Sequence, residues 1–193
     1  LFMIPKKKSD QSFPAKPVFR NEKVLKLKRK SWAVNPSEQN VLVLDTPAFR
    51  IGEDGKWEKA SEILRVDSKI KDFLGIQRRG GQMMQPWARK KNPAPEKTLV
   101  NLSYEFDVKE VPFGMLALAL EKPETFKIAI NGNKLSSDSE SGFWCDRSLR
   151  TITFSSNLLK KGVNELTLEC DYTEEHPGLE IIYILGDFSV KVS

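Results

Sequence analysis

The sequence predicts an all-β protein, an antiparallel β-sandwich with a short helix and one long loop. The first observation is a regular alternation of apolar and polar residues, clearest over residues 100–108. A strand shows this pattern when one face is buried and the other meets water. The second is a series of turn signals roughly ten residues apart, a spacing typical of sandwiches. The third is the length of 193 residues, which suffices for one well-buried domain and not for two large ones.

The expected strands differ in how many of their faces are buried. Residues 41–44 form one expected strand, and Leu25 and Leu27 alternate with lysines before it. Two continuous apolar runs, residues 115–120 and 181–185, lack alternation, so we expect strands that are covered on both faces. Half-buried strands, which pair antiparallel, are expected over residues 100–108, 126–130, 152–154 and 166–172.

Turn residues separate these strands. Asn131-Gly132 stands between residues 126–130 and 133–135, and both turn residues tolerate the positive φ of a tight hairpin. Lys161-Gly162 is a second turn, ahead of the strand at 166–172. A hairpin is therefore expected at the first turn, and a new strand after the second.

One short helix is expected over residues 67–74. Asp67 or Ser68 is the expected N-cap, and Gly75 is expected to end the helix. The longest irregular stretch follows at residues 76–97, and a loop of this length is typical of a functional segment. The helix residues expected to face the core are Ile70, Phe73 and Leu74.

The positive charge of the chain is concentrated at its start. Residues 1–30 contain ten basic and two acidic side chains, a net charge of +8, so the rest of the chain carries −3 of the total of +5. A folded body that binds nucleic acid should itself be positive, so we expect no nucleic-acid partner. We predict a linker or extended segment over residues 1–22 and a single β-sandwich domain over residues 23–193. Because the sequence starts at Leu1, we also expect it to belong to a longer polypeptide.

Several kinds of chemistry find no support in the sequence. Two cysteines, Cys145 and Cys170, and one histidine, His176, are too few for a zinc site, and whether the cysteines form a disulfide stays open. There is neither a Gly-x-Ser-x-Gly elbow nor a phosphate-binding glycine loop, so no catalytic residue, cofactor or metal is predicted. No run approaches the roughly 20 apolar residues that cross a bilayer, so no membrane partner is expected.

Two ordered series of segments carry a family resemblance. FKIAING at 126–132, SGFWCD at 141–146 and LLKKGVNELTL at 158–168 resemble the sugar-binding-like domain of family 2 glycoside hydrolases and related galactose-binding-like jelly rolls. The second series is similar to C-terminal domains of large bacterial proteins that resemble α-L-rhamnosidases, and spans residues 23–193. It consists of NVLVLD at 40–45, QPW at 85–87, LALE at 118–121 and IYILGDF at 182–188.

The resemblance implies a jelly roll that serves as a non-catalytic accessory module of a glycoside hydrolase in polysaccharide degradation, in an extracellular or periplasmic location. Its partner would be the catalytic domain of the same polypeptide. The module would either pack against that domain and stabilise it or bind a glycan weakly. The alternative from another class is a free-standing β-sandwich hydrolase or lyase acting on polysaccharide.

A glycan site on a sandwich needs an aromatic face for the apolar side of the sugar ring, beside polar groups for its hydroxyls. Trp87 in the long loop is the first candidate, with Gln85 and Arg89 as its polar neighbours. The other interpretation is that Trp87 pins the loop onto the sandwich. Trp144 with Asp146 is the second candidate, and the other interpretation is a buried, structural Trp144.

Three further features have simple structural interpretations. Trp57 follows a turn and is expected to cap a strand edge. His176 lies beside two acids and before Pro177-Gly178, the setting of an exposed turn and not of a catalytic base. A basic cluster of the long loop could meet an acidic polysaccharide, although such clusters more often form ordinary solvated surface: Arg78, Arg79, Arg89, Lys90, Lys91 and Lys97.

Overall fold

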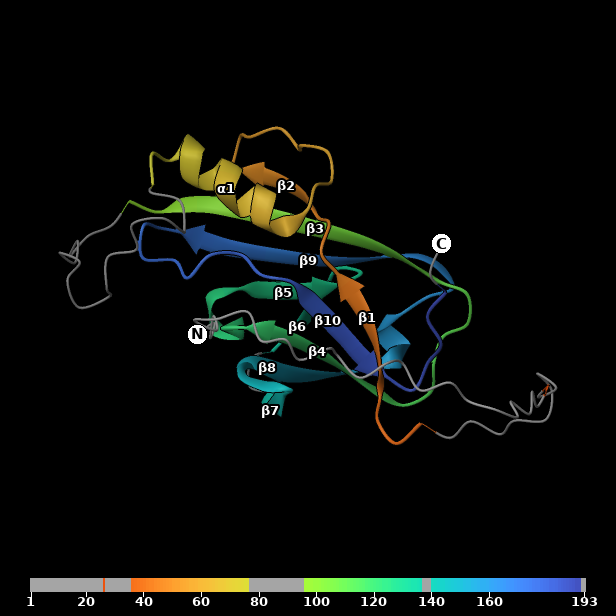
Figure 1. Ribbon diagram of the computed structural model, residues 1–193. Helices are drawn as coiled ribbons and strands as arrows, with labels where there is room; N and C mark the ends of the chain where they lie inside the picture. Colours follow the sequence, from red (N-terminus) through yellow and green to blue (C-terminus); the bar gives the residue numbers. More distant parts are fainter. Residues whose placement is uncertain (1–25, 27–35, 77–95, 137–139, 192–193) are drawn as a thin grey trace, which may run out of the picture. The chain divides into compact units, whose positions relative to one another are not determined.

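The computed structural model of the chain describes Lys26 and residues 36–76, 96–136 and 140–191. Ser37–Ser193 belong to one compact unit, and the fold below is that of this unit. Its described strands form two five-stranded sheets in which all neighbouring strands are antiparallel. The predicted all-β sandwich is confirmed (Figure 1).

The two sheets draw their strands from the whole length of this unit. The first, sheet A, has the order β1-β10-β4-β8-β7, and the second, sheet B, has the order β2-β3-β9-β5-β6. Sheet A contains β1 (Asn40–Leu44), β4 (Met115–Glu121), β7 (Glu140–Trp144), β8 (Asp146–Ser155) and β10 (Ile182–Gly186). Sheet B contains β2 (Ala48–Ile51), β3 (Thr98–Val108), β5 (Lys127–Ile130), β6 (Asn133–Leu135) and β9 (Gly162–Tyr172). Along the described part of the chain, three short helical elements connect the strands: the helix α1 (Ile63–Phe73) and the 3-10 turns η3 (Pro123–Thr125) and η5 (Ser156–Leu158).

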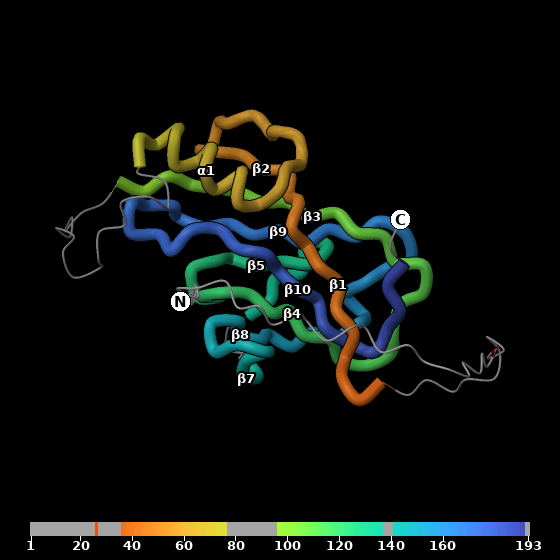
Figure 2. The backbone as a smooth tube through the Cα atoms, in the orientation of Figure 1, coloured from red at the N-terminus to blue at the C-terminus, as the bar shows by residue number. Residues whose placement is uncertain are grey.

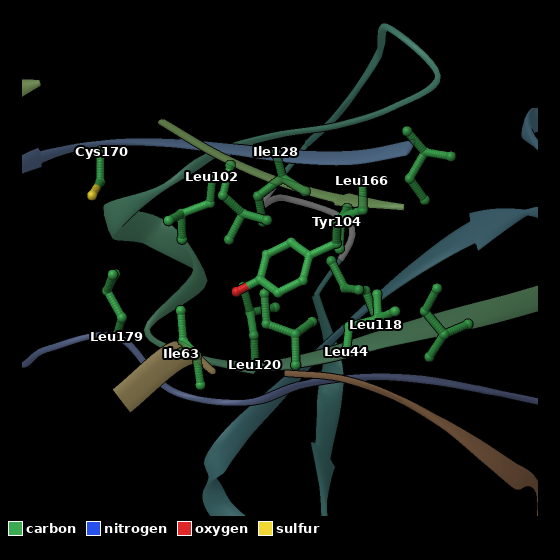
Figure 3. Packing of buried hydrophobic residues seen from close by; sticks show 14 of the residues in the cluster. Leu44, Ile63, Leu102, Tyr104, Leu118, Leu120, Ile128, Leu166, Cys170 and Leu179 are labelled. Carbon is green, nitrogen blue, oxygen red and sulfur yellow. The ribbon is translucent and has the colours of Figure 1, made fainter. Parts of the chain in front are cut away.

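The facing sides of the two sheets share one hydrophobic core (Figure 3). In β3 the alternation predicted from the sequence buries Val100, Leu102 and Tyr104 and turns the residues between them outward. Leu118 of β4 and Ile184 of β10 meet them from sheet A. The alternating residues therefore decide which face of each strand lies inside.

Strands β4 and β10 are largely covered on both faces, as their continuous apolar runs predict. On the outer face of sheet A, Ala117, Ala119 and Leu185 are buried in a second, smaller cluster. Partly buried aromatic side chains, Trp144 and Tyr183, pack against this cluster. The small alanines leave room for these rings to lie over the sheet.

The predicted hairpin at Asn131-Gly132 is confirmed. The two residues have φ angles of 48° and 80° and join β5 to β6, which pair in antiparallel register. Gly162, with a φ of 93°, likewise begins β9, so a new strand follows the second turn as its signal predicts. Both turns use the left-handed backbone region that glycine and asparagine tolerate best.

The helix differs from its prediction at its start. It begins at Ile63, because the carboxylate of Glu62 accepts hydrogen bonds from the backbone N–H groups of Leu64 and Arg65 and so caps the first turn. The predicted start at residue 67 and the predicted caps Asp67 and Ser68 are therefore wrong. The predicted end is right, since Leu74 is the C-cap and Gly75 adopts a φ of 66°.

The helix residues that face the core also differ from the prediction. Ile70 is buried as predicted, but Phe73 is 71% exposed and does not face the core. The core-facing residues of the added first turn are Ile63 and Val66, with Ile70 completing the apolar stripe at helical spacing. Phe73 continues this spacing, but it is the last residue of the helix and its side chain lies mostly in water.

Two strands were not predicted, and several predictions lie outside the described residues. β2 is short, and β7 contains register shifts between Glu140 and Gly142 and between Phe143 and Trp144, so neither carries a clean alternation. The expected strand through Leu25 and Leu27, the linker at residues 1–22 and residues 77–95 of the long loop lie outside the described residues.

Candidate functional site

A cleft of about 750 Å³ opens at one end of the sandwich. It lies between the edge strand β1 and the end of β3, and its other walls are the β3–β4 loop and the segment that follows β10. Figure 2 traces these last two segments to the same end of the fold, near the C-terminus. Phe106, Leu116 and Ile184 line the cleft and belong to the core. The cleft is thus an opening onto the hydrophobic interior.

The rim of the cleft exposes apolar side chains. Phe113, in the β3–β4 loop, is 98% exposed. Val43, Val111 and Val190 also line the cleft and also count among the exposed large hydrophobic residues. Leaving one such side chain in water forgoes about 1.5–3 kcal/mol of burial. Apolar side chains gathered at one exposed place mark an interaction surface more often than scattered ones do.

The loop that carries Phe113 is tied to the sheet. The backbone N–H of Ser156 donates to the carbonyl of Gly114 at 3.0 Å, and Gly114 has a φ of 85°. This conformation favours glycine. The chain therefore turns directly after Phe113, and the anchored loop holds the phenyl ring in water.

Charged residues surround the apolar rim. Glu105, Asp107, Glu110 and Asp187 outnumber Lys109 and Lys191 among the residues that line the cleft, a net charge of −2. Lys109 forms an ion pair with Asp107. The surface that would complement this end has an apolar centre and basic residues around it.

Sequence reasoning missed this cleft. The available signal is the apolar triplet Val111-Pro112-Phe113, which stands in a turn between two strands where polar residues are usual. Which side chains line the cleft depends on β1, β3 and the residues after β10 meeting at one end. That meeting cannot be found from any one segment.

The structure places Trp144 and Asp146 on either side of a tight turn. Trp144 ends β7, Asp146 begins β8, and Cys145 between them has a φ of 56°. The Trp144 ring is partly buried, with its centroid 5.1 Å from that of Tyr183 and the two planes at 55°. The ring is therefore partly occupied in covering the outer face of sheet A.

The carboxylate of Asp146 is engaged in its own turn. Its Oδ1 accepts a hydrogen bond from the backbone N–H of Ser148 at 2.7 Å. Hydrogen bonds from the backbone and side chain of Ser148 lower the pKa of this exposed carboxyl. Asp146 thus has a structural task at the start of β8. The other candidates, Gln85, Trp87 and Arg89, lie outside the described residues, as do all members of the basic cluster except Lys97, which pairs with Asp171 at 3.3 Å.

His176 is half-buried in an aromatic stack. Its ring lies 4.5 Å from Tyr172 in a stacked arrangement and 5.8 Å from Phe126 edge-on, measured between centroids. Its Nδ1 accepts a hydrogen bond from the backbone N–H of Gly178 at 3.0 Å. These contacts hold the turn after β9 against the sandwich, so the residue is more enclosed than its sequence setting predicts.

The two cysteines do not form a disulfide. Cys145 and Cys170 are both free, with Cys145 exposed on the β7–β8 turn and Cys170 buried in β9. Burial, together with the charges of Asp171 and Glu169, raises the pKa of the Cys170 thiol to about 12. Cys170 therefore behaves as an apolar core residue.

Neither a metal-binding cluster nor a family match accompanies this site. In the part of the chain that the structure describes, no group of three or more His, Cys, Asp or Glu side chains is placed to hold a metal ion. The helices among those residues are too short or too polar to cross a membrane. Comparison with protein-family models, curated proteins and solved structures finds no match. The function is therefore inferred from the surfaces of the fold.

Proposed function

We propose that this chain is a non-catalytic β-sandwich module that docks onto another domain of the same polypeptide through the cleft between β1, β3 and the segment after β10. The observation that carries the proposal is Phe113, which stands 98% exposed at the rim of this cleft on an anchored loop. When a second apolar surface covers this phenyl ring and the opening beside it, the burial of apolar surface stabilises the docked state.

Charge narrows the kind of partner. The net charge of −2 around the cleft favours a protein surface with basic residues around an apolar centre, and disfavours a polyanion or an acidic membrane. The one histidine of the chain, His176, is not among the residues that line the cleft. The chemistry of the cleft therefore supports docking over catalysis.

We further assign the partner as the catalytic domain of a carbohydrate-active enzyme, and the sandwich as a jelly roll of the galactose-binding-like kind. Support comes from the ordered sequence segments that resemble accessory domains of glycoside hydrolases. Two of them form one turn-rich corner, since FKIAING ends in the β5–β6 turn and LLKKGVNELTL opens β9, the strand beside β5. The module would stabilise the catalytic domain, outside the cytoplasm, during polysaccharide degradation.

Hydrogen exchange tests the docking. Exchange of the amides at residues 105–116 and 187–191 is followed in this chain alone and in the full polypeptide that contains it. We expect at least about tenfold slower exchange in the full polypeptide, because a docked surface excludes water. Phe113→Asp should restore fast exchange there. Phe73→Asp is the matched control, because Phe73 is also highly exposed but lies on α1, away from the cleft.

Two results would overturn the proposal separately. Equal exchange of the cleft segments in both proteins would show that no domain covers them. If the full polypeptide released no product from a panel of p-nitrophenyl glycosides and soluble polysaccharides, the docking would stand and the assignment to a carbohydrate-active enzyme would fall.

A further inference from the structure

A single row of side chains crosses the outer face of sheet B. Residues 57–58 extend the sheet at the free edge of β2, where the N–H of Glu58 donates to the carbonyl of Phe49 at 2.8 Å. Trp57 therefore stands opposite Arg50, whose guanidinium carbon lies 5.5 Å from the Trp57 ring centroid. Strand register continues the row from Arg50 to Asn101, Glu169 and Lys127.

All members of the row face away from the core. Phe49, Val100 and Leu102, the strand neighbours of Arg50 and Asn101, are buried in the core, so the alternation of each strand turns Arg50 and Asn101 outward. Trp57 is 51% exposed. The contact between its ring and Arg50 fixes one face of the indole and leaves the ring partly in water.

Two donors in this row are unsatisfied. Arg50 Nε and Asn101 Nδ2 are shielded from solvent and have no hydrogen-bond partner among the described residues. A shielded donor without a partner costs stability, which a purely structural surface avoids with smaller or apolar side chains. Departures of this kind are more common at functional sites than on purely structural surfaces.

The neighbouring row is made of small residues up to β5 and ends at Lys134 of β6. Ala48, Ser103, Thr167 and Ala129 lie side by side in register, directly next to the Trp57 row. Small side chains let a flat ligand approach the sheet closely. The Ser103 hydroxyl donates to Glu165 at 2.6 Å. The carboxylate of Glu165 therefore lies on the side of this row that is away from Trp57.

Charge on the face is balanced. Over three adjacent rows, three cations, Arg50, Lys127 and Lys134, accompany three carboxylates, Glu105, Glu165 and Glu169. Two further carboxylates at outward positions of the same face, Asp107 and Asp171, form ion pairs with Lys109 and Lys97. Lys127 is also paired with Glu169 at 2.6 Å. A balanced face gives little attraction to a polyanion. The row from residue 57 to β5 spans four strand spacings, about 19 Å at ~4.8 Å each.

We infer that the outer face of sheet B binds a neutral glycan chain, with Trp57 as the stacking platform and Arg50, Asn101 and Glu169 as hydrogen-bonding partners of its hydroxyls. A neutral sugar combines apolar ring faces with many hydroxyl groups, which matches an aromatic ring beside amide, guanidinium and carboxylate groups. This site is independent of the docking cleft, since none of these four residues lines it.

Titration calorimetry of this chain tests the inference. The probes are neutral hexasaccharides of glucose, mannose, xylose and galactose, with hexagalacturonate as the charged comparison. We expect at least one neutral hexasaccharide to bind, Trp57→Ala and Asn101→Ala each to weaken the binding at least about tenfold, and Trp57→Phe to retain most of it. Trp144→Ala and Phe113→Asp should bind as the unchanged chain does, since they alter the other sheet and the cleft.

Circular dichroism and thermal unfolding confirm that each variant is folded, and Asn101→Ala supports the test if Trp57→Ala fails to fold. Absence of binding to every neutral probe would overturn the inference, and so would equal binding by Trp57→Ala, Asn101→Ala and the unchanged chain. Binding of hexagalacturonate alone, abolished by salt, would also overturn it in favour of simple charge attraction. None of these results depends on the docking proposal, whose test is hydrogen exchange at the cleft.

Discussion

Asp67 and Lys71 stand one turn apart on α1 and form a buried ion pair, with 2.7 Å between Oδ2 and Nζ. The other carboxylate oxygen of Asp67 accepts hydrogen bonds from the Tyr172 hydroxyl at 2.7 Å and the Leu179 N–H at 2.9 Å. One carboxylate thus joins the helix to the end of β9 and to the segment before β10. Because a buried charge is tolerated only when it is paired and hydrogen-bonded, this network fixes α1 on the sandwich.

Asp67→Asn should lower the free energy of unfolding by about 3–5 kcal/mol, because it leaves the charge of Lys71 buried without a partner. Urea denaturation measures the change. The double variant Asp67→Asn with Lys71→Met should recover at least half of the loss, since it removes the orphaned charge as well. Lys97→Met, which breaks an exposed pair with Asp171, is the control and should cost less than about 1 kcal/mol. Equal losses in the single and double variants would contradict this account.

The same carboxylate predicts how stability depends on pH. Burial tends to raise the pKa of Asp67, but hydrogen bonds from Lys71, Tyr172 and the Leu179 N–H, together with the charge of Lys71, outweigh it and lower the pKa from its ordinary value. A folded pKa below the unfolded value of about 3.9 means that the contribution is present above that pH and lost as the pH falls through the folded pKa. We expect the unfolding free energy to fall more steeply below about pH 5 in the unchanged chain than in Asp67→Asn. Parallel pH profiles would exclude Asp67 as the titrating group.

Tyr104 provides a prediction in the opposite direction. Its hydroxyl lies in the core with no hydrogen-bond partner among the described residues (Figure 3). Desolvation, with the charge of Asp45, raises the pKa of this hydroxyl. An unsatisfied buried hydroxyl costs about 1–3 kcal/mol, so Tyr104→Phe should raise the free energy of unfolding by about 1 kcal/mol. Tyr172→Phe is the matched comparison and should lower it, because the Tyr172 hydroxyl donates to Asp67. Destabilisation by both substitutions would show that the Tyr104 hydroxyl has a partner in solution.

The strands were predictable where one local pattern decides the structure. The alternation in β3, the Asn131-Gly132 turn and the apolar runs of β4 and β10 each depend on residues within a few positions of one another. The start of α1 was not predictable in this way. Asp67 is a good N-cap residue by type, but tertiary partners bury its carboxylate in mid-helix, and Glu62 caps the first turn instead.

The candidate sites depend on register between distant strands, which composition does not reveal. Trp57 follows a turn and lies at the edge of β2, where Glu58 bridges to Phe49 and the Trp57 ring contacts Arg50. That Arg50, Asn101 and Glu169 continue its row becomes visible only when β2, β3 and β9 are aligned. The cleft likewise requires the β3–β4 loop to meet the residues after β10.

The last prediction concerns the buried polar side chain of Asn164, near the start of β9. Asn164 is 1% exposed, its Nδ2 donates to the carbonyls of Lys160 and Gly162, and its Oδ1 accepts from the Lys160 N–H and from Asn131 Nδ2. Asn164→Ala removes all four bonds and leaves buried groups without partners, so it should lower the free energy of unfolding by about 3 kcal/mol. Asn133→Ala is the control, because Asn133 is exposed and its two hydrogen bonds are long, at 3.3 Å each. It should cost less than about 1 kcal/mol in the same urea titration. A similar cost for both substitutions would mean that Asn164 does no more than an ordinary surface turn residue.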